Sequence, residues 1–208
     1  MKKLLAIFLV TLLTLSLAAC GENKNSAGSN SSDDKNVSDN KETNNEPNES
    51  SAQSPLELLN TVWNSYEEDD KFPAAGGDMS EENMTMSAPG KFGIADTTAL
   101  DTTLGFPEAS VEKIDEAASL VHMMNANTFT CGAFHVKNAD DSDDVSTTIK
   151  DNIMQRQWMC GFPDKLVIVK VDQYIISFFG ENEIIDTFKT KLTAAYTSAE
   201  IIFEESIA

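Results

Sequence analysis

The sequence predicts an α+β domain: a mostly antiparallel sheet of two β-hairpins with helices packed on one face. The clearest hairpin joins residues 166–169 to residues 174–179 through an Asp-Gln turn, and both arms are rich in β-branched and aromatic side chains. Segments before and after it repeat apolar residues at helical spacing. Two similar tetrapeptides, residues 105–108 and 161–164, suggest two pseudo-repeated units; chance recurrence of so short a match is the alternative.

The domain is expected to begin with an amphipathic helix over residues 55–67. Ser54 stands at the N-cap, Pro55 takes the first helical position, and Glu57 completes a capping box. Four apolar side chains then share one helical face: Leu59, Val62, Trp63 and Tyr66. The acidic run 67–70 ends this helix in solvent.

The middle of the domain is harder to assign. Residues 71–93 are rich in Pro, Gly, Asn and Met and are expected to be irregular, whereas residues 96–104 predict a short helix that Gly105 stops. Residues 128–136 predict a strand. Residues 111–124 fit either a helix or the partner strand of a second hairpin.

Two further helices are expected around the clearest hairpin. Asp144 or Ser146 caps the first of them, which carries Ile149, Ile153 and Trp158. Asn182 caps the second. Its apolar face holds Ile184, Ile185, Phe188, Leu192 and Tyr196. The expected order is therefore helix, hairpin, helix, hairpin, helix.

The N-terminus predicts a bacterial lipoprotein signal peptide over residues 1–19. Two lysines precede an apolar run that is shorter than the roughly 20 residues needed to span a bilayer. Leu17, Ala18 and Ala19 then lead to Cys20 as a lipobox, and Leu17 disfavours ordinary secretory cleavage, which prefers a small residue there. Cys20 is expected to become the N-terminus and to carry a diacylglycerol, whose two chains anchor a protein stably to the membrane.

Residues 20–53 are expected to form the lipidated cysteine and a disordered tether, and residues 54–208 a single domain. After Cys20 the tether holds eight Asn and seven Ser among 33 residues, so it buries too little apolar surface to offset its ordering entropy. As a coil it would span on the order of 30 Å. The domain carries 27 acidic and ten basic side chains, and its formal charge of −17 repels nucleic acid and anionic head groups.

Cys131 and Cys160 are the two cysteines of the domain, and each is followed by glycine. Outside the cytoplasm such a pair is compatible with a disulfide, which would stabilise the fold by roughly 3–4 kcal/mol in the chain-entropy model. Two separate buried thiols are the alternative. The Cys-x-x-Cys spacing of redox-active pairs is absent.

Several segments of the last 90 residues or so carry a family resemblance. They are the run His-Met-Met-Asn-Ala-Asn-Thr-Phe-Thr at 122–130, residues 133–135, residues 157–164, the Val-rich hairpin and residues 184–189. With the layout of signal, tether and domain, they resemble an uncharacterised family of Firmicutes lipoproteins often labelled "bacteriocin transport accessory protein". The resemblance implies a Gram-positive envelope and a strand at residues 111–121, and it supplies no active site.

The sequence predicts a non-enzymatic protein without a cofactor. Its only histidines are His122 and His135, and it has no nucleophile elbow, phosphate-binding loop or dinucleotide fingerprint. The acidic run 140–144 is followed by Val145 where a calcium loop needs glycine, so a polar turn is favoured. A Cu(I) site would draw on Met84, Met86, His122 and Met123, although methionines at such spacings usually fill cores.

These observations predict a lipid-anchored, extracytoplasmic binding or accessory module of the cell envelope, associated with export. We expect it to contact the membrane through its anchor, to bind an unidentified protein or peptide, and not to bind nucleic acid. A small-ligand or metal-binding lipoprotein is one alternative, and a thiol-redox protein is another. An exposed apolar surface would favour the first function, a closed pocket the second and a reactive cysteine in a cleft the third.

Overall fold

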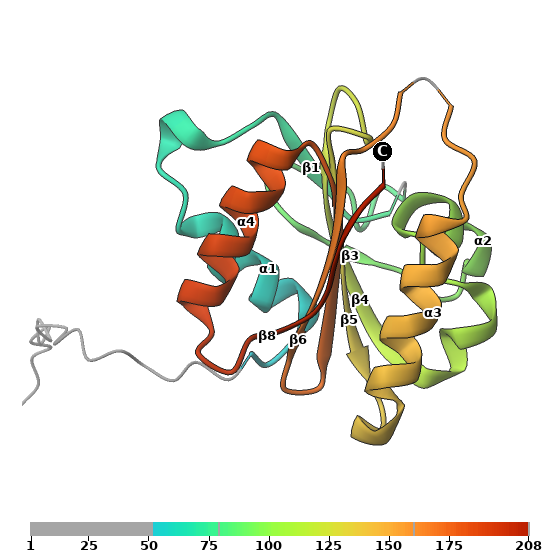
Figure 1. The fold of residues 1–208 in the computed structure, drawn as a ribbon. Helices are drawn as coiled ribbons and strands as arrows, with labels where there is room; N and C mark the ends of the chain where they lie inside the picture. The colour runs from blue at the N-terminus through green and yellow to red at the C-terminus, as the bar shows by residue number, and fades with distance from the viewer. Residues whose placement is uncertain (1–51, 79, 160, 208) are drawn as a thin grey trace, which may run out of the picture. The chain divides into compact units, whose positions relative to one another are not determined.

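The computed structural model describes residues 52–78, 80–159 and 161–207. The predicted signal peptide, the lipobox, Cys20 and all but the end of the tether lie outside these residues, as does Cys160. The described chain confirms the predicted α+β class, because it forms an open antiparallel sheet with helices packed against it (Figure 1).

One sheet of eight strands has the order β2-β1-β4-β5-β7-β6-β8, and β3 also pairs with β4. The strands are β1 (Ala74–Gly76), β2 (Thr85–Met86), β3 (Gly90–Phe92), β4 (Ile114–His122), β5 (Phe129–Val136), β6 (Lys165–Val171), β7 (Tyr174–Gly180) and β8 (Glu200–Ser206). β1 pairs with Val121 and His122, whereas β3 pairs with residues 117–119, so both short strands share one edge of β4.

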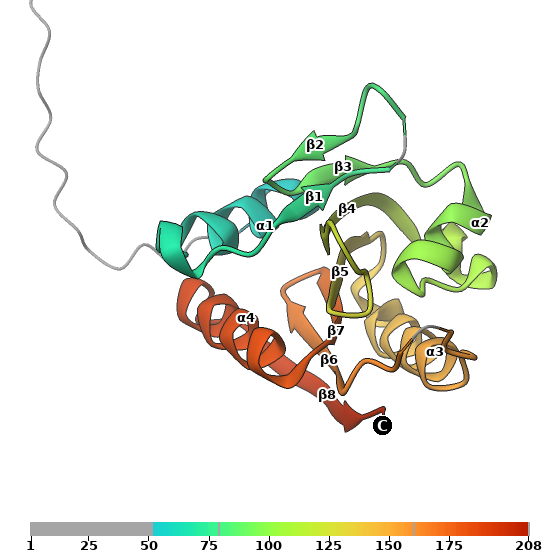
Figure 2. The ribbon, with the colours of Figure 1, turned by 90° about the horizontal axis from the view of Figure 1, so that it is seen from above.

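Helices cover both faces of this sheet, and the prediction of helices on one face is wrong. Helices α1 (Pro55–Asn64) and α4 (Asn182–Ala195) lie on one face, and α3 (Ser142–Met154) and α2 (Thr97–Ala99) lie on the other (Figures 1 and 2). Alternate residues of β6 enter two separate cores, Val167 and Val169 on the α1 and α4 side and Leu166 and Ile168 on the α3 side. An unbroken apolar strand is typical of two-sided burial.

Both hairpins form as antiparallel pairs, β4 with β5 and β6 with β7, which resolves residues 114–122 as a strand. The order helix, hairpin, helix, hairpin, helix is confirmed. The two tetrapeptides, however, are not equivalent. Both begin with a glycine at positive φ, Gly105 at 72° and Gly161 at 116°, but Phe106 is fully buried while Phe162 is 65% exposed.

Helix α1 begins as predicted, with the Glu57 backbone N–H donating to Ser54 Oγ at 3.1 Å, and it ends at Asn64. Helix α3 begins at Ser142, ahead of the predicted caps, and ends before Trp158. Asn182 is the first residue of helix α4 and not its cap as predicted, because the N-cap is Glu181. Asp164 of the preceding loop accepts from the Asn182 backbone N–H at 3.1 Å. The short helix is followed by a π-helical turn, Leu100–Leu104, which Gly105 ends in the left-handed conformation.

The sequence analysis missed four strands. Residues 71–93 hold β1, β2 and β3, and the C-terminal residues form β8 at the outer edge of β6. Strands of two or three residues give no alternating pattern that could predict them. Strand β8 depends on partners elsewhere in the chain, since Glu204 is paired with both Lys165 and Lys189.

The segment between β1 and β2 is organised by one carboxylate, that of Asp78. Its oxygens accept hydrogen bonds from the Ser80 backbone and hydroxyl, from Asn83 Nδ2 at 2.8 Å and from the Gly93 backbone N–H at 2.8 Å. Burial alone would raise the pKa of Asp78, but these hydrogen bonds outweigh it and lower the pKa from 3.8 to about 2. The ionised form is therefore part of the folded segment.

We predict that Asp78→Asn lowers the free energy of unfolding at pH 7 by about 1 kcal/mol. The new side-chain NH₂ group would replace one carboxylate oxygen and face donors that the carboxylate now accepts from. A lowered pKa contributes stability that is complete above the ordinary value and disappears as the pH falls. The wild type should therefore lose stability between about pH 4 and pH 2 through this group. Urea unfolding across this range checks the prediction. Glu81→Gln, at an exposed site in the same segment, is the matched control; equal losses for both variants would contradict it.

Candidate functional site

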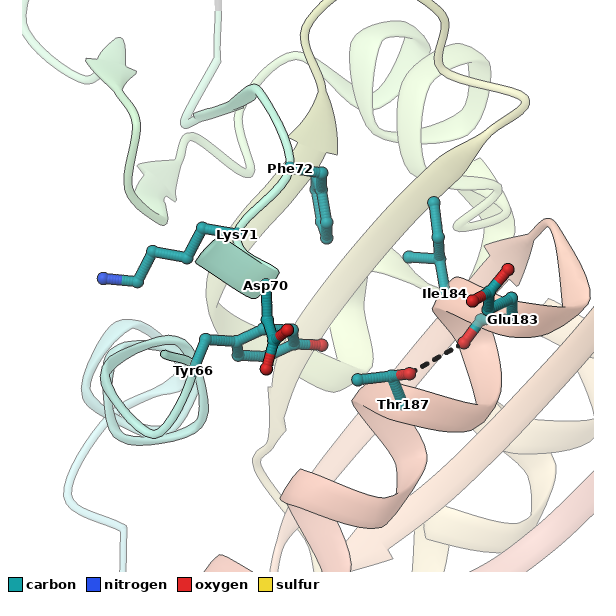
Figure 3. A pocket seen from close by; sticks show the side chains of 7 residues that line it. All are labelled: Tyr66, Asp70, Lys71, Phe72, Glu183, Ile184 and Thr187. Atoms are coloured by element: carbon teal, nitrogen blue, oxygen red, sulfur yellow. Dashed lines mark hydrogen bonds between the residues drawn. The ribbon is translucent and has the colours of Figure 1, made fainter. Parts of the chain in front are cut away.

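One candidate site is a groove between the end of α1 and the start of α4, with a volume of about 390 Å³. Figure 3 shows its two walls facing each other. The lining residues, here called the α1–α4 groove, are Tyr66, Asp70, Lys71, Phe72, Glu183, Ile184 and Thr187. The first four follow the end of α1, and the last three lie in the first turns of α4.

An aromatic cluster holds the α1 wall in place. Trp63 packs on Tyr66 with ring centroids 5.1 Å apart and on Phe72 at 5.0 Å, and Phe72 in turn packs on Phe129 of β5 at 5.0 Å. The indole N–H of Trp63 donates to the Ser87 carbonyl at 2.9 Å, which ties the cluster to the segment after β2. Because these rings are packed together, the groove keeps its shape without a ligand.

Tyr66 has a buried hydroxyl that finds no hydrogen-bond partner in the part of the chain that the structure describes. The residue is only 5% exposed, and burial, the nearby Cys131 and the Asp70 carboxylate together raise the pKa of Tyr66 well above its usual value. The phenol is therefore neutral at physiological pH. The Nζ of Lys191 lies 4.6 Å from the centroid of the Tyr66 ring. The same ammonium group donates to the Ser65 carbonyl at 2.9 Å, so Lys191 joins α4 to the end of α1.

The groove offers mainly hydrogen-bond acceptors. Asp70 and Glu183 supply carboxylates from opposite walls. The Thr187 hydroxyl already donates to the Glu183 carbonyl at 2.9 Å, as the dashed line in Figure 3 shows, and keeps only its acceptor capacity. Lys71 is the one cation in the lining, and its Nζ is held 2.7 Å from Glu68. Figure 3 shows its side chain pointing away from the opening.

Exposed apolar side chains lie at the same end of the sheet as the groove. Met123 and Met124, 48% and 76% exposed, follow β4, and Met159 and Phe162, 81% and 65% exposed, precede β6. Asn127 Nδ2 joins the two loops by donating to the Gly161 carbonyl at 3.1 Å. His122 stacks on Phe72 with centroids 5.7 Å apart and so connects these loops to the groove. Apolar side chains exposed on neighbouring loops are typical of interaction surfaces.

A second hollow of about 400 Å³ lies between the β1–β2 segment and α2. Its two carboxylates already serve the local fold: Asp78 organises the segment, and Asp96 accepts from the Ala99 backbone N–H at 2.9 Å as a helix cap. The remaining lining is formed largely by Gly, Ala and Phe92. We therefore regard it as a weaker candidate site than the α1–α4 groove.

The residues of the hypothetical Cu(I) site are divided between the faces of the sheet. His122 pairs with Ala74 and therefore faces α1, whereas Met86 and Val121 both pair with Ala75 and face the other way. The His122 Nδ1 accepts from the Met124 and Asn125 backbone N–H groups, both at 3.3 Å. Met84, Met86 and Met123 are exposed. In the described ranges, no three His, Cys, Asp or Glu side chains are grouped so that they could hold a metal ion.

Neither histidine has the neighbours of a nucleophilic site. His135 Nδ1 lies 2.6 Å from Asp115 Oδ1, and its ring packs on Tyr174 with centroids 5.0 Å apart, an arrangement that the sequence analysis did not anticipate. The Cys131 thiol is four residues along the same strand, about 13 Å away at a rise of roughly 3.3 Å per residue. A general base must lie within hydrogen-bond reach of the proton it removes. His135 is therefore too far from Cys131 to act as its base, and we regard the His135–Asp115 pair as structural.

The disulfide with Cys160, which lies outside the described residues, stays a prediction; the structure has Cys131 as a free thiol. Its side chain is fully buried in the core under α1 and α4, where burial raises the pKa of the thiol well above its usual value. Because the thiolate is the reactive species, this environment also disfavours redox chemistry at Cys131. Its burial fits the alternative of a small core residue.

Lys113 explains part of the acidic run 140–144. It forms ion pairs with Asp144 and, at 3.4 Å, with Asp141. Asn138 Oδ1 accepts from the Asp140 backbone N–H as the cap of a short 3-10 helix, Ala139–Asp141. The run is therefore a capped polar turn, as the sequence analysis favoured, and not a calcium loop.

Comparisons with family models, curated proteins and solved structures gave no match to this chain. Among the described residues, no helix has the length and apolar character needed to cross a membrane.

We predict that a thiol-alkylating reagent leaves Cys131 unmodified in the native protein and modifies it fully in denaturant, without prior reduction. Burial and the raised pKa both withhold the thiolate from the reagent. Peptide mass mapping after iodoacetamide treatment separates Cys131 from Cys160. Modification that requires a reductant even in denaturant would instead demonstrate a bridge.

Proposed function

We propose that this protein is a lipid-anchored, non-enzymatic binding module on the outer face of the cytoplasmic membrane, and that the α1–α4 groove receives a segment of a partner protein or peptide. The observation that carries the proposal is the groove itself, an open hollow whose buried Tyr66 hydroxyl has no hydrogen-bond partner among the described residues. The lipobox that ends at Cys20 supports the anchor.

The groove lies away from the point at which the tether joins the domain. The tether would join the domain at the start of α1. Glu57 in the first turn of α1 lies near Tyr174 at the β6–β7 turn, because it contributes, after burial, to the raised pKa of Tyr174. Tyr66 and Phe72 follow the other end of α1, roughly 15 Å along a helix of ten residues. The groove and the exposed Met and Phe loops therefore lie at the end of the domain away from the point of attachment.

The two alternatives have less support. The hollows are open or lined by groups that already have partners, which disfavours a small-ligand or metal carrier, and the buried Cys131 disfavours thiol-redox chemistry. The resemblance to lipoproteins labelled as transport accessories favours a role beside an export system. We include this role in the proposal as the context in which a partner would be met.

We predict that the protein released from its own cells carries a diacylglyceryl group on Cys20 and begins at this residue. Intact-mass measurement of detergent-extracted protein checks this. Cys20→Ser should retain the signal peptide or release an unlipidated chain, and it should move the protein out of the membrane fraction. A wild-type chain that is cleaved and unlipidated would exclude the anchor.

We also predict that a photo-crosslinking amino acid at Thr187 gives one discrete adduct in living cells. The same group at Thr147, an exposed site on α3 across the sheet, should give none. Ile184→Trp, which fills the groove, should abolish the Thr187 adduct without changing the level of the protein. An adduct that persists when the groove is filled would place the partner elsewhere.

A further inference from the structure

The chemistry of the groove also defines the class of its occupant. We infer that the partner segment inserts a cationic side chain, a lysine or an arginine, between Asp70 and Glu183. This inference rests on the proposed function, because it specifies what the α1–α4 groove would recognise.

Negative charge surrounds the opening on both walls. Four consecutive acids, residues 67–70, lie on the α1 wall, and Lys71 neutralises one of them by pairing with Glu68. Glu183 faces them from α4, while Asp186 farther along α4 is paired with Lys165 and Lys189. With a formal charge of −17 on the domain, a positively charged segment is attracted at a distance and an anionic one is repelled.

The buried Tyr66 hydroxyl is the second, independent observation. Figure 3 shows the Tyr66 side chain extending into the space between α1 and α4, beside Asp70. A buried hydroxyl without a partner costs free energy. An ammonium or guanidinium group carries three or five donors and no acceptor, so it can donate to the phenolic oxygen and to carboxylates of the lining.

The protein already shows that this aromatic wall accepts a cation. Lys191 places its ammonium group 4.6 Å from the centroid of the Tyr66 ring, and Lys71 lies 5.8 Å from that of Trp63. Phe72 adds another ring to the lining of the groove. Cations are attracted to the faces of aromatic rings. A neutral apolar segment would leave Tyr66 without a partner and would bring no counter-charge to Asp70 and Glu183.

The test uses the full mature chain with Cys20→Ser, so that no lipid is present, and three synthetic peptides. The peptides share one apolar framework and carry Lys, Gln or Glu at the other positions. We expect the Lys peptide alone to shift the backbone amide NMR signals of Asp70, Ile184 and Thr187. Asp70→Asn and Glu183→Gln should each weaken its binding by about two- to fivefold, the effect of one exposed ion pair.

Two further variants separate recognition from general charge and from folding. Glu205→Gln removes one charge from β8, distant from the groove, and should leave the affinity unchanged. Tyr66→Phe should weaken binding by about fivefold through the lost hydrogen bond. It should leave the melting temperature unchanged or higher, because no described residue bonds to this hydroxyl.

Equal binding of the Gln or Glu peptide at these residues, or loss of affinity with Glu205→Gln as large as with Asp70→Asn, would overturn the inference. So would the absence of any shift at the groove with the Lys peptide. These results leave the proposed function standing if the Thr187 adduct depends on the groove, because the partner would then bind there through other chemistry.

Discussion

The structure depends on the burial of both faces of its central strands. Strands β5, β6 and β7 carry apolar side chains on both faces of the sheet. A sheet of this kind cannot be stable with one face in water. One helical layer therefore has to come from α1 and α4, which are distant in sequence, and the other from α2 and α3. The groove lies where α1 has ended and α4 has just begun, so the first layer does not close over the sheet there.

The properties of the groove follow from this layer. Trp63 and Phe72 pack in the core that supports α1. The acidic residues 68–70 lie in the exposed 3-10 helix between them. Tyr66 lies at the boundary, with a ring that is packed and a hydroxyl that is not satisfied. Among the described residues, five have a buried side-chain polar atom without a partner: Tyr66, Ser142, Trp158, Ser177 and Tyr196. Of these, Tyr66 lines the groove, where a ligand can supply the partner that buried polar groups usually have.

Local signals in the sequence were sufficient for most elements. The capping box at Ser54, the Gly105 stop, the helix from Asn182 and the second hairpin are encoded in a few adjacent residues, and the structure contains each of them. The groove could be predicted only in parts. The apolar face of the first helix included Tyr66, and the acidic run 67–70 was evident, but Glu183 and Thr187 lie more than 100 residues away.

The sequence by itself determined the α+β class, the order of helices and hairpins, and the charge, because periodicity, caps and composition are local properties. The lipobox at Cys20 stays a prediction from the same local signals. Only the tertiary structure decided that helices cover both faces, that β1, β2, β3 and β8 join the sheet, and that Cys131 is a buried free thiol. It alone placed Asp70 and Glu183 on opposite walls of one groove. Such contacts join residues far apart in the chain, and their free energy comes from shared burial, which no single segment specifies.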